Sequence, residues 1–102
     1  MLLAIDAGNS NVTLAVFYGA ELQVHWRLAT NVARTSDEYG AALRNLFQLA
    51  DLNEKDLEAI VIASVVPALN LTLQRMAETY FKLTPIFVDH TTRTGLKINY
   101  DS

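Results

Sequence analysis

Apolar residues in the first third of the chain follow the spacing of β-strands. Residues 2–5 form a short, unbroken apolar run, which is typical of a strand covered on both faces. Residues 12–17 are rich in β-branched and aromatic side chains, and residues 22–28 alternate between apolar and polar. Residues 18–21, which contain a glycine, resemble a hairpin connection. The pattern therefore predicts three consecutive strands, the third with one face in solvent.

From Thr35 onwards the apolar spacing changes to 3.6 residues, which predicts an amphipathic helix. Its buried stripe would consist of Tyr39, Ala42, Leu43, Leu46, Phe47 and Ala50. Thr35 and Glu38 fit a capping box, in which each side chain bonds the backbone N–H of the other residue. Residues 53–56 predict a short turn or a capped helical piece.

The second half of the chain predicts two further strands with a helix between them. Residues 59–63 form an apolar run typical of a central strand. Pro67 predicts the first turn of the helix, because proline is favoured there. The buried side of that helix would consist of Leu69, Leu73, Met76, Ala77 and Tyr80. Residues 85–88 predict the last strand, and the polar remainder through Ser102 contains Gly95 as a turn.

The order strand-strand-strand-helix-strand-helix-strand predicts an α/β fold. An antiparallel meander followed by right-handed strand-helix-strand units gives a mixed five-stranded sheet with helices packed against it. This arrangement is that of a ribonuclease-H-like domain, the fold of the actin-like ATPases. A Rossmann fold is not expected, because it would not begin with three consecutive strands. Since no repeat or linker divides the sequence, we expect a single domain over residues 1–102.

Composition narrows the classes of function. With 8 basic and 11 acidic residues the formal charge is −3, so we expect no broad basic face for nucleic acid. The absence of cysteine excludes disulfides and thiolate metal sites, and we expect structural roles for His25 and His90. No apolar stretch approaches the about 18 residues of a membrane span. Because the N-terminus also lacks a signal-peptide pattern, we expect a cytoplasmic protein.

The first turn lies in residues 5–11, IDAGNSN, and two explanations of it are open. A plain hairpin accounts for Gly8, Asn9 and Asn11, because these residue types tolerate positive φ. It does not account for Asp6, since a carboxylate at the end of a buried strand costs free energy unless it is paired, hydrogen-bonded or near a metal.

A phosphate-binding turn accounts for both features. Gly8 would let the backbone approach an anion, and Asp6 would orient a Mg²⁺ ion or its waters. Further N–H and side-chain donors would come from Asn9, Ser10, Asn11 and Thr13. The P-loop and G-x-G-x-x-G motifs are absent, and both join a strand to a helix, whereas this turn joins two strands.

Five segments resemble the N-terminal half of type III pantothenate kinases. They are IDAGNSNVTLAVF, HWRLAT, TSDEY, VIASVVP and TGLKINYD, in matching order and spacing over essentially the whole chain. This family is a member of the acetate and sugar kinase/Hsp70/actin superfamily. The resemblance implies transfer of the γ-phosphoryl group of ATP to the primary hydroxyl of pantothenate, the first step of coenzyme A biosynthesis. It also implies Mg²⁺, a monovalent cation (K⁺ or NH₄⁺) and a homodimer in the full-length family.

The resemblance also implies roles for individual residues. Contacts with ATP fall on the first phosphate motif, which comprises Asp6, Ala7, Gly8, Asn9, Ser10, Asn11, Val12 and Thr13. Asp6 is the implied metal contact, and Tyr100 matches a tyrosine that contacts pantothenate. Ser10 stands where the family more often has threonine, so the hydroxyl is retained.

The family pattern continues beyond Ser102, the last residue of this sequence. A Gly-Ala-Asp-Arg segment follows in the family, whose aspartate is the implied base and whose arginine is implied to hold the carboxylate of pantothenate. We therefore expect no catalytic base within residues 1–102, since the implied base lies beyond Ser102. We expect a truncated or isolated N-terminal domain, without the C-terminal domain that carries further ATP contacts, the monovalent-cation site and much of the dimer interface.

Three functional hypotheses follow. The first is the phosphate-binding lobe of a pantothenate kinase, inactive as an isolated chain. The second is a folding or assembly half-domain that self-associates or binds a separate C-terminal half. The third is a kinase or phosphohydrolase of the same superfamily for sugars, acetate or polyphosphate, against which the TGLKINYD segment argues. Arg93 and Lys97 are expected to be solvated loop cations.

Overall fold

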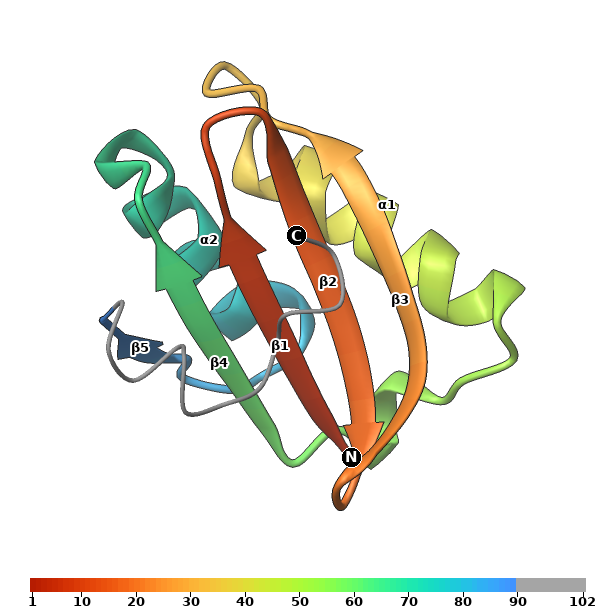
Figure 1. The fold of residues 1–102 in the computed structure, drawn as a ribbon. Helices are drawn as coiled ribbons and strands as arrows, with labels where there is room; N and C mark the ends of the chain where they lie inside the picture. The colour runs from red at the N-terminus through yellow and green to blue at the C-terminus, as the bar shows by residue number, and fades with distance from the viewer. Residues whose placement is uncertain (90–102) are drawn as a thin grey trace.

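Strand β1 (Leu2–Ala7) lies at the centre of a five-stranded sheet (Figure 1). The computed structural model of the protein describes residues 1–89. Along the chain β1 is followed by β2 (Asn11–Tyr18), β3 (Glu21–Ala29), α1 (Ser36–Leu49), the 3₁₀ helix η1 (Glu54–Asp56), β4 (Ala59–Ser64), α2 (Pro67–Tyr80) and β5 (Ile86–Val88). The predicted order of strands and helices is confirmed.

Several residues named in the sequence analysis lie outside the described residues. They are His90, Arg93, Gly95, Lys97, Tyr100 and Ser102. The roles expected for His90, Arg93, Lys97 and Tyr100 therefore stay predictions. The same holds for the expectation that the catalytic base lies beyond Ser102.

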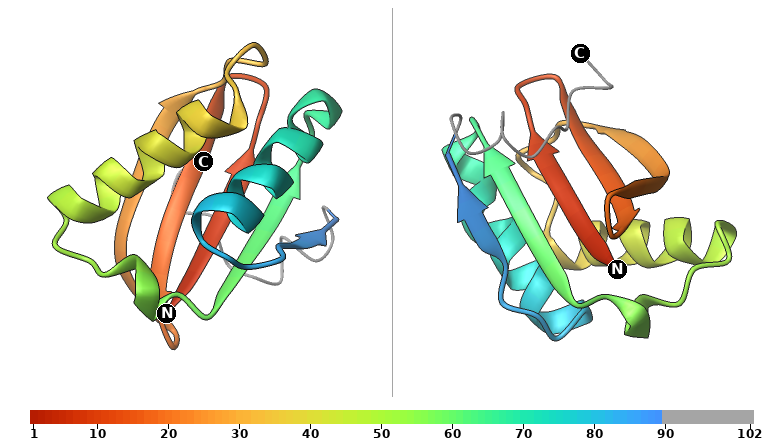
Figure 2. Two further views of the ribbon diagram at one scale, coloured as in Figure 1. Left: turned by 180° about the vertical axis from the view of Figure 1, so that it is seen from behind. Right: turned by 60° about the horizontal axis from the view of Figure 1, so that its bottom comes forward.

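The sheet is mixed, as predicted. Its strand order is β3-β2-β1-β4-β5. Strand β1 pairs antiparallel with β2 and parallel with β4, and β4 pairs parallel with β5. Figure 2 shows α1 and α2 side by side on one face of the sheet. The predicted α/β fold with a mixed five-stranded sheet is therefore confirmed.

The main core fills the space between the two helices and the sheet. Leu3, Ile5 and Ala7 of β1 point into it, together with Tyr39 of α1 and Leu69 of α2. Alternate residues of β1 face the other side, where Ala4 packs with Ala15 and Phe17 in a smaller cluster. The two faces of β1 thus have different surroundings, and among the described residues only one is covered by helices.

The helices begin as the sequence predicts. The Thr35 side chain accepts a hydrogen bond from the Glu38 N–H at 3.1 Å, and the Thr35 N–H donates to the Glu38 carboxylate at 2.8 Å. The predicted capping box of α1 is therefore confirmed. Helix α2 begins at Pro67 and is preceded by Val66, which makes no side-chain cap bond.

Helices α1 and α2 approach closely at Gly40. A Cβ atom added there would lie 2.4 Å from Cδ2 of Tyr80, so the tyrosine ring occupies the space of a side chain. The Tyr80 hydroxyl donates to the Asp37 carboxylate at 2.5 Å. This hydrogen bond to a carboxylate raises the pKa of Tyr80 above its ordinary value of 10.0. One ring thus joins the two helices by packing and by a polar contact.

The C-terminal end of α1 forms a Schellman motif. The Leu52 N–H donates to the Phe47 carbonyl at 2.9 Å, and the Asp51 N–H donates to the Gln48 carbonyl at 3.1 Å. Asp51 has a φ of 59°, in the left-handed region where glycine is usually found. The carboxylate also lies at the negative end of the helix dipole. Asp51 is therefore unfavourable for stability on two counts.

Substitution of Gly40 by alanine should destabilise the protein. Alanine normally favours a helix over glycine by about 1 kcal/mol, but here overpacking against Tyr80 should cost about 1–3 kcal/mol. Urea unfolding should show a lower free energy of unfolding for Gly40→Ala. In a Tyr80→Ala background the same substitution should be neutral or stabilising. An equal effect in both backgrounds would contradict the proposed contact.

Substitution of Asp51 by glycine should stabilise the protein. Relief of the left-handed strain should add about 1 kcal/mol to the free energy of unfolding, measured by urea unfolding. Asp51→Ala is the matched control, because it removes the same charge and keeps the strain. If Asp51→Ala stabilises as much as Asp51→Gly, the backbone explanation is wrong.

Candidate functional site

The turn between β1 and β2 is the candidate site that the sequence predicts. Ala7 pairs with Val12 at its base, and the Gly8 N–H donates to the Asn11 carbonyl at 2.8 Å. The plain-hairpin explanation, in which Gly8, Asn9 and Asn11 are present because they tolerate positive φ, is wrong on this point, because positive φ in residues 1–89 occurs only at Gly19, Asp51 and Lys82.

Glycine at position 8 has a different reason. A Cβ atom there would lie 3.2 Å from the Asn11 carbonyl oxygen, which is tighter than most side chains allow. The absence of a side chain therefore permits the close approach of the two strands where the turn begins. Gly19, with a φ of 58°, takes the left-handed conformation in the β2–β3 connection instead.

Thr30 holds both arms of this turn from the end of β3. Its hydroxyl donates to the Gly8 carbonyl at 2.7 Å, and its N–H donates to the Ser10 carbonyl at 2.9 Å. Thr30 is not among the site residues predicted from the sequence. The available signal was a polar residue directly after a strand, at the end of HWRLAT, but only the register of β2 with β3 places it at the turn.

The predicted binding residues divide between the two faces of the sheet. Ala7 and Val12 are fully buried in the helix-side core, so only their main-chain atoms could reach a ligand. Asp6 and Thr13 are paired in register and lie on the other face, Asp6 partly buried and Thr13 5% exposed. The exposed residues at the tip are Asn9, Ser10 and Asn11. Polar side chains are thus gathered at the tip and on the face without described helices.

A cross-strand row runs through Asp6. Its neighbours in register are Ala63 of β4 on one side and Thr13 of β2 on the other, and Thr13 in turn pairs with Arg27 of β3. The Asp6 carboxylate, the Thr13 hydroxyl and the Arg27 guanidinium therefore belong to neighbouring positions on three adjacent strands. No group of three or more possible metal ligands occurs among residues 1–89. A single carboxylate beside phosphates still suits Mg²⁺, which usually keeps several waters.

The N-terminus of α2 lies at the same end of the sheet as the turn (Figure 1). The Val65 N–H donates to the Ala7 carbonyl at 3.0 Å, which ties the β4–α2 connection to the end of β1. The Val66 N–H donates to the Ser64 hydroxyl at 3.0 Å, which supports the bend into the helix. The positive end of the α2 dipole therefore faces this end of the sheet, where it would favour an anion bound by the turn.

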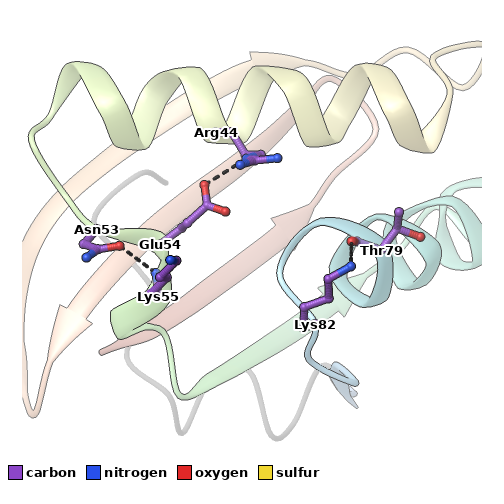
Figure 3. A network of polar contacts seen from close by, with 6 residues as sticks. All are labelled: Arg44, Asn53, Glu54, Lys55, Thr79 and Lys82. Atoms are coloured by element: carbon purple, nitrogen blue, oxygen red, sulfur yellow. Dashed lines mark hydrogen bonds and ion pairs between the residues drawn. The ribbon is translucent and has the colours of Figure 1, made fainter.

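Two surface hollows, of about 410 and 260 Å³, lie between α1, η1 and the end of α2. Several of the polar groups that line them contact one another or the backbone (Figure 3). Arg44 donates to the Glu54 carboxylate at 2.9 Å, and the Lys82 ammonium donates to the Thr79 carbonyl at 2.9 Å. We therefore assign these side chains to holding η1 and the end of α2.

The hollows are also at the wrong end of β1 to serve the turn. The Met1 ammonium donates to the Asp56 carbonyl at 2.9 Å, so η1 adjoins the start of β1. The polar turn follows the other end of that strand. The candidate site is therefore the turn and its surroundings, namely Asp6, Thr13, Thr30 and the start of α2.

Comparison with known proteins gives the family. A family model described as type III pantothenate kinase matches residues 2–102. The chain belongs to the type III pantothenate kinase family. The resemblance predicted from the sequence is confirmed.

Several curated type III pantothenate kinases match the whole chain. Those of Anaeromyxobacter sp. (strain K), Myxococcus xanthus and Halalkalibacterium halodurans are 51%, 46% and 44% identical to it over 102 residues. The chain spans about 40% of the length of each of these relatives.

A solved structure supports the fold. A crystal structure of a Porphyromonas gingivalis protein that carries the name N-acetylglucosamine kinase superposes on 87% of the chain, and on 34% of its own chain, with a TM-score of 0.62 and 15% identity. This likeness shows that the two chains share a fold. Among residues 1–89, no helix is long and apolar enough to span a membrane.

Proposed function

We propose that this chain is the phosphate-binding lobe of a kinase that transfers the γ-phosphoryl group of ATP to pantothenate. The observation that carries the proposal is the turn at residues 8–10, whose carbonyls are held by Thr30 and which adjoins Asp6 and the start of α2. Membership of the type III pantothenate kinase family supports the identity of the two substrates.

In the proposed reaction the primary hydroxyl oxygen of pantothenate forms a bond to the γ-phosphorus of ATP. The bond from phosphorus to the bridging oxygen breaks, ADP leaves with that electron pair, and the hydroxyl proton passes to a base. Since this transfer requires mainly positioning and charge neutralisation, a lobe that holds the phosphates contributes directly to it. No residue of 1–89 is assigned as the base, and by family analogy we place it beyond Ser102.

The chain's own residues would bind and orient the phosphates. Main-chain N–H groups of the turn and the hydroxyls of Ser10 and Thr13 would donate to phosphate oxygens. Asp6 would hold Mg²⁺ or its waters, and the metal would neutralise charge on the phosphates. Ala7 and Val12 would contribute only backbone, because their side chains are in the core.

Several further features of such a kinase lie outside the described geometry. They are the contact of Tyr100 with pantothenate, the K⁺ or NH₄⁺ ion, the homodimer, the second ATP-binding wall and a cytoplasmic location. The shared family supports each of them by analogy.

The assembly half-domain is the second candidate. Ile86 and Phe87 of β5 favour it, because they are 57% and 40% exposed at the edge of the sheet. Both candidates predict a catalytically silent chain, and only the first predicts that the turn responds to nucleotide.

Mg·ATP should shift the backbone amide signals of residues 8–13 in an NMR titration of the chain. We expect Asp6→Asn to weaken the Mg²⁺-dependent part of the response, since an amide is a poorer metal ligand than a carboxylate. Asp56→Asn is the matched control, because η1 lies at the other end of β1. If the turn ignores nucleotide up to millimolar concentrations, the phosphate-binding role of the isolated chain is wrong.

The chain alone should not phosphorylate pantothenate at an enzymatic rate. Without the base and a second wall, we expect it to lose roughly 7 kcal/mol of positioning, or about 100,000-fold in rate. A coupled ADP-release assay measures this. Activity that survives Asp6→Asn would indicate a contaminating kinase, whereas enzyme-like turnover that Asp6→Asn abolishes would refute the predicted silence.

A further inference from the structure

We propose that Thr30 is a positioning residue, whose two hydrogen bonds aim the N–H groups of Asn9 and Asn11 at the bound phosphate. The inference rests on the proposed function for its ligand, while its geometry rests on the turn alone. Thr30 would not itself touch the phosphate. It would act through the two peptide groups whose carbonyls it binds.

Planarity of the peptide group couples each bound carbonyl to the N–H that follows it. In a trans peptide the C=O and the next residue's N–H point in opposite directions. The Gly8 carbonyl shares its peptide plane with the Asn9 N–H, and the Ser10 carbonyl shares its plane with the Asn11 N–H. No cis peptide bond occurs in residues 1–89. Because both carbonyls point towards Thr30, both N–H groups point away from it.

The two peptide groups are constrained by different kinds of hydrogen bond, one from the main chain and one from the side chain of Thr30. The Ser10 carbonyl is bound by the main-chain N–H of Thr30, which continues the β2–β3 ladder beyond the pair Asn11 and Ala29. Any residue except proline at position 30 could make that bond. The Gly8 carbonyl is bound by the Thr30 hydroxyl, which only serine and threonine could supply in this geometry.

Gly8 is the reason that its peptide needs such a constraint. Glycine has wide backbone freedom, so the peptide between Gly8 and Asn9 could rotate if the carbonyl lost its partner. Rotation would turn the Asn9 N–H away and present a carbonyl oxygen to the phosphate. A donor would then be replaced by a repelling acceptor at the same place.

Position 30 is well suited to this task because it follows another strand. Thr30 is 22 residues from Gly8 in sequence, and β3 is fixed by its pairing with β2 from Asn11 to Tyr18. The side chain is partly buried, which limits competition from water for the Gly8 carbonyl. The two carbonyls of the turn are therefore oriented by a residue that the sheet holds in place.

The test compares Thr30→Val with Thr30→Ser in the 102-residue chain. Valine has the shape of threonine without the hydroxyl, and serine keeps the hydroxyl. Binding of Mg·ATP and of inorganic tripolyphosphate with Mg²⁺ is followed by the amide signals of the turn. We expect Thr30→Val to weaken binding about 10-fold or more, because the hydrogen bond from the Asn9 N–H to the charged phosphate would be lost. Thr30→Ser should stay within about 3-fold of the parent.

The pattern of signals distinguishes positioning from general loss of structure. In Thr30→Val the Asn9 amide should lose its response to the ligand, while the Asn11 amide should keep most of its own. Thr30→Ser should restore the Asn9 response. Equal binding and an unchanged Asn9 response in Thr30→Val would overturn the proposal.

A measurement without ligand separates this inference from the proposed function. The residual dipolar coupling of the Asn9 N–H reports its orientation, and it should change in Thr30→Val while those of β1 do not. Unchanged coupling would overturn the role of Thr30 whatever the chain binds. A changed coupling with no binding in any variant would support the role of Thr30 and refute the phosphate function. If Thr30→Val does not fold, Thr30→Ala provides the same comparison.

Discussion

Pairing of β1 on both sides is the constraint on which the rest of the structure depends. Because β2 lies antiparallel on one side and β4 parallel on the other, the main chain of β1 is satisfied along its whole length. Its helix-side residues form the middle of the core. The end of β1 is thereby fixed in position, and the polar turn is attached to a rigid strand.

The mixed pairing also decides what meets at that end. The antiparallel partner, β2, follows β1 directly through the turn. The parallel partner, β4, ends beside the end of β1 and continues into α2. A strand end, a tight turn and a helix start therefore come together, although Asp6 and Pro67 are far apart in sequence. Crevices at the carboxyl ends of strands are common ligand sites in α/β folds. Here the arrangement follows from the order of only three strands.

Much of this fold could be predicted from local patterns. An apolar run, a run of β-branched and aromatic residues and a period-two run indicated the first three strands. Thr35 with Glu38 marked the start of α1, and Pro67 marked the start of α2. These signals depend on residues close together in sequence, so a single sequence was sufficient to predict the elements. The family segments then supplied the functional hypothesis, and the match to residues 2–102 confirms the family.

The details of the candidate site could not be predicted in the same way. Gly8 was interpreted as a residue that tolerates the positive φ of a hairpin turn, but its φ is not positive, and the close approach of Asn11 explains this glycine. Thr30 was missed because its role depends on the register of β3, which contains an irregularity near Val16 and Phe17. Period-two spacing predicts which residues share a face and leaves their cross-strand partners undetermined.

The contact between Gly40 and Tyr80 limits how the helical layer can move. On the same face of α1 the neighbours of Gly40 are three and four residues away, and all of them carry a Cβ atom, so the tyrosine ring lies at the one position there without a side chain. A slide of one helix along the other would drive the ring towards one of these side chains. The absence of a side chain at Gly40 therefore fixes the axial position of α1 against α2.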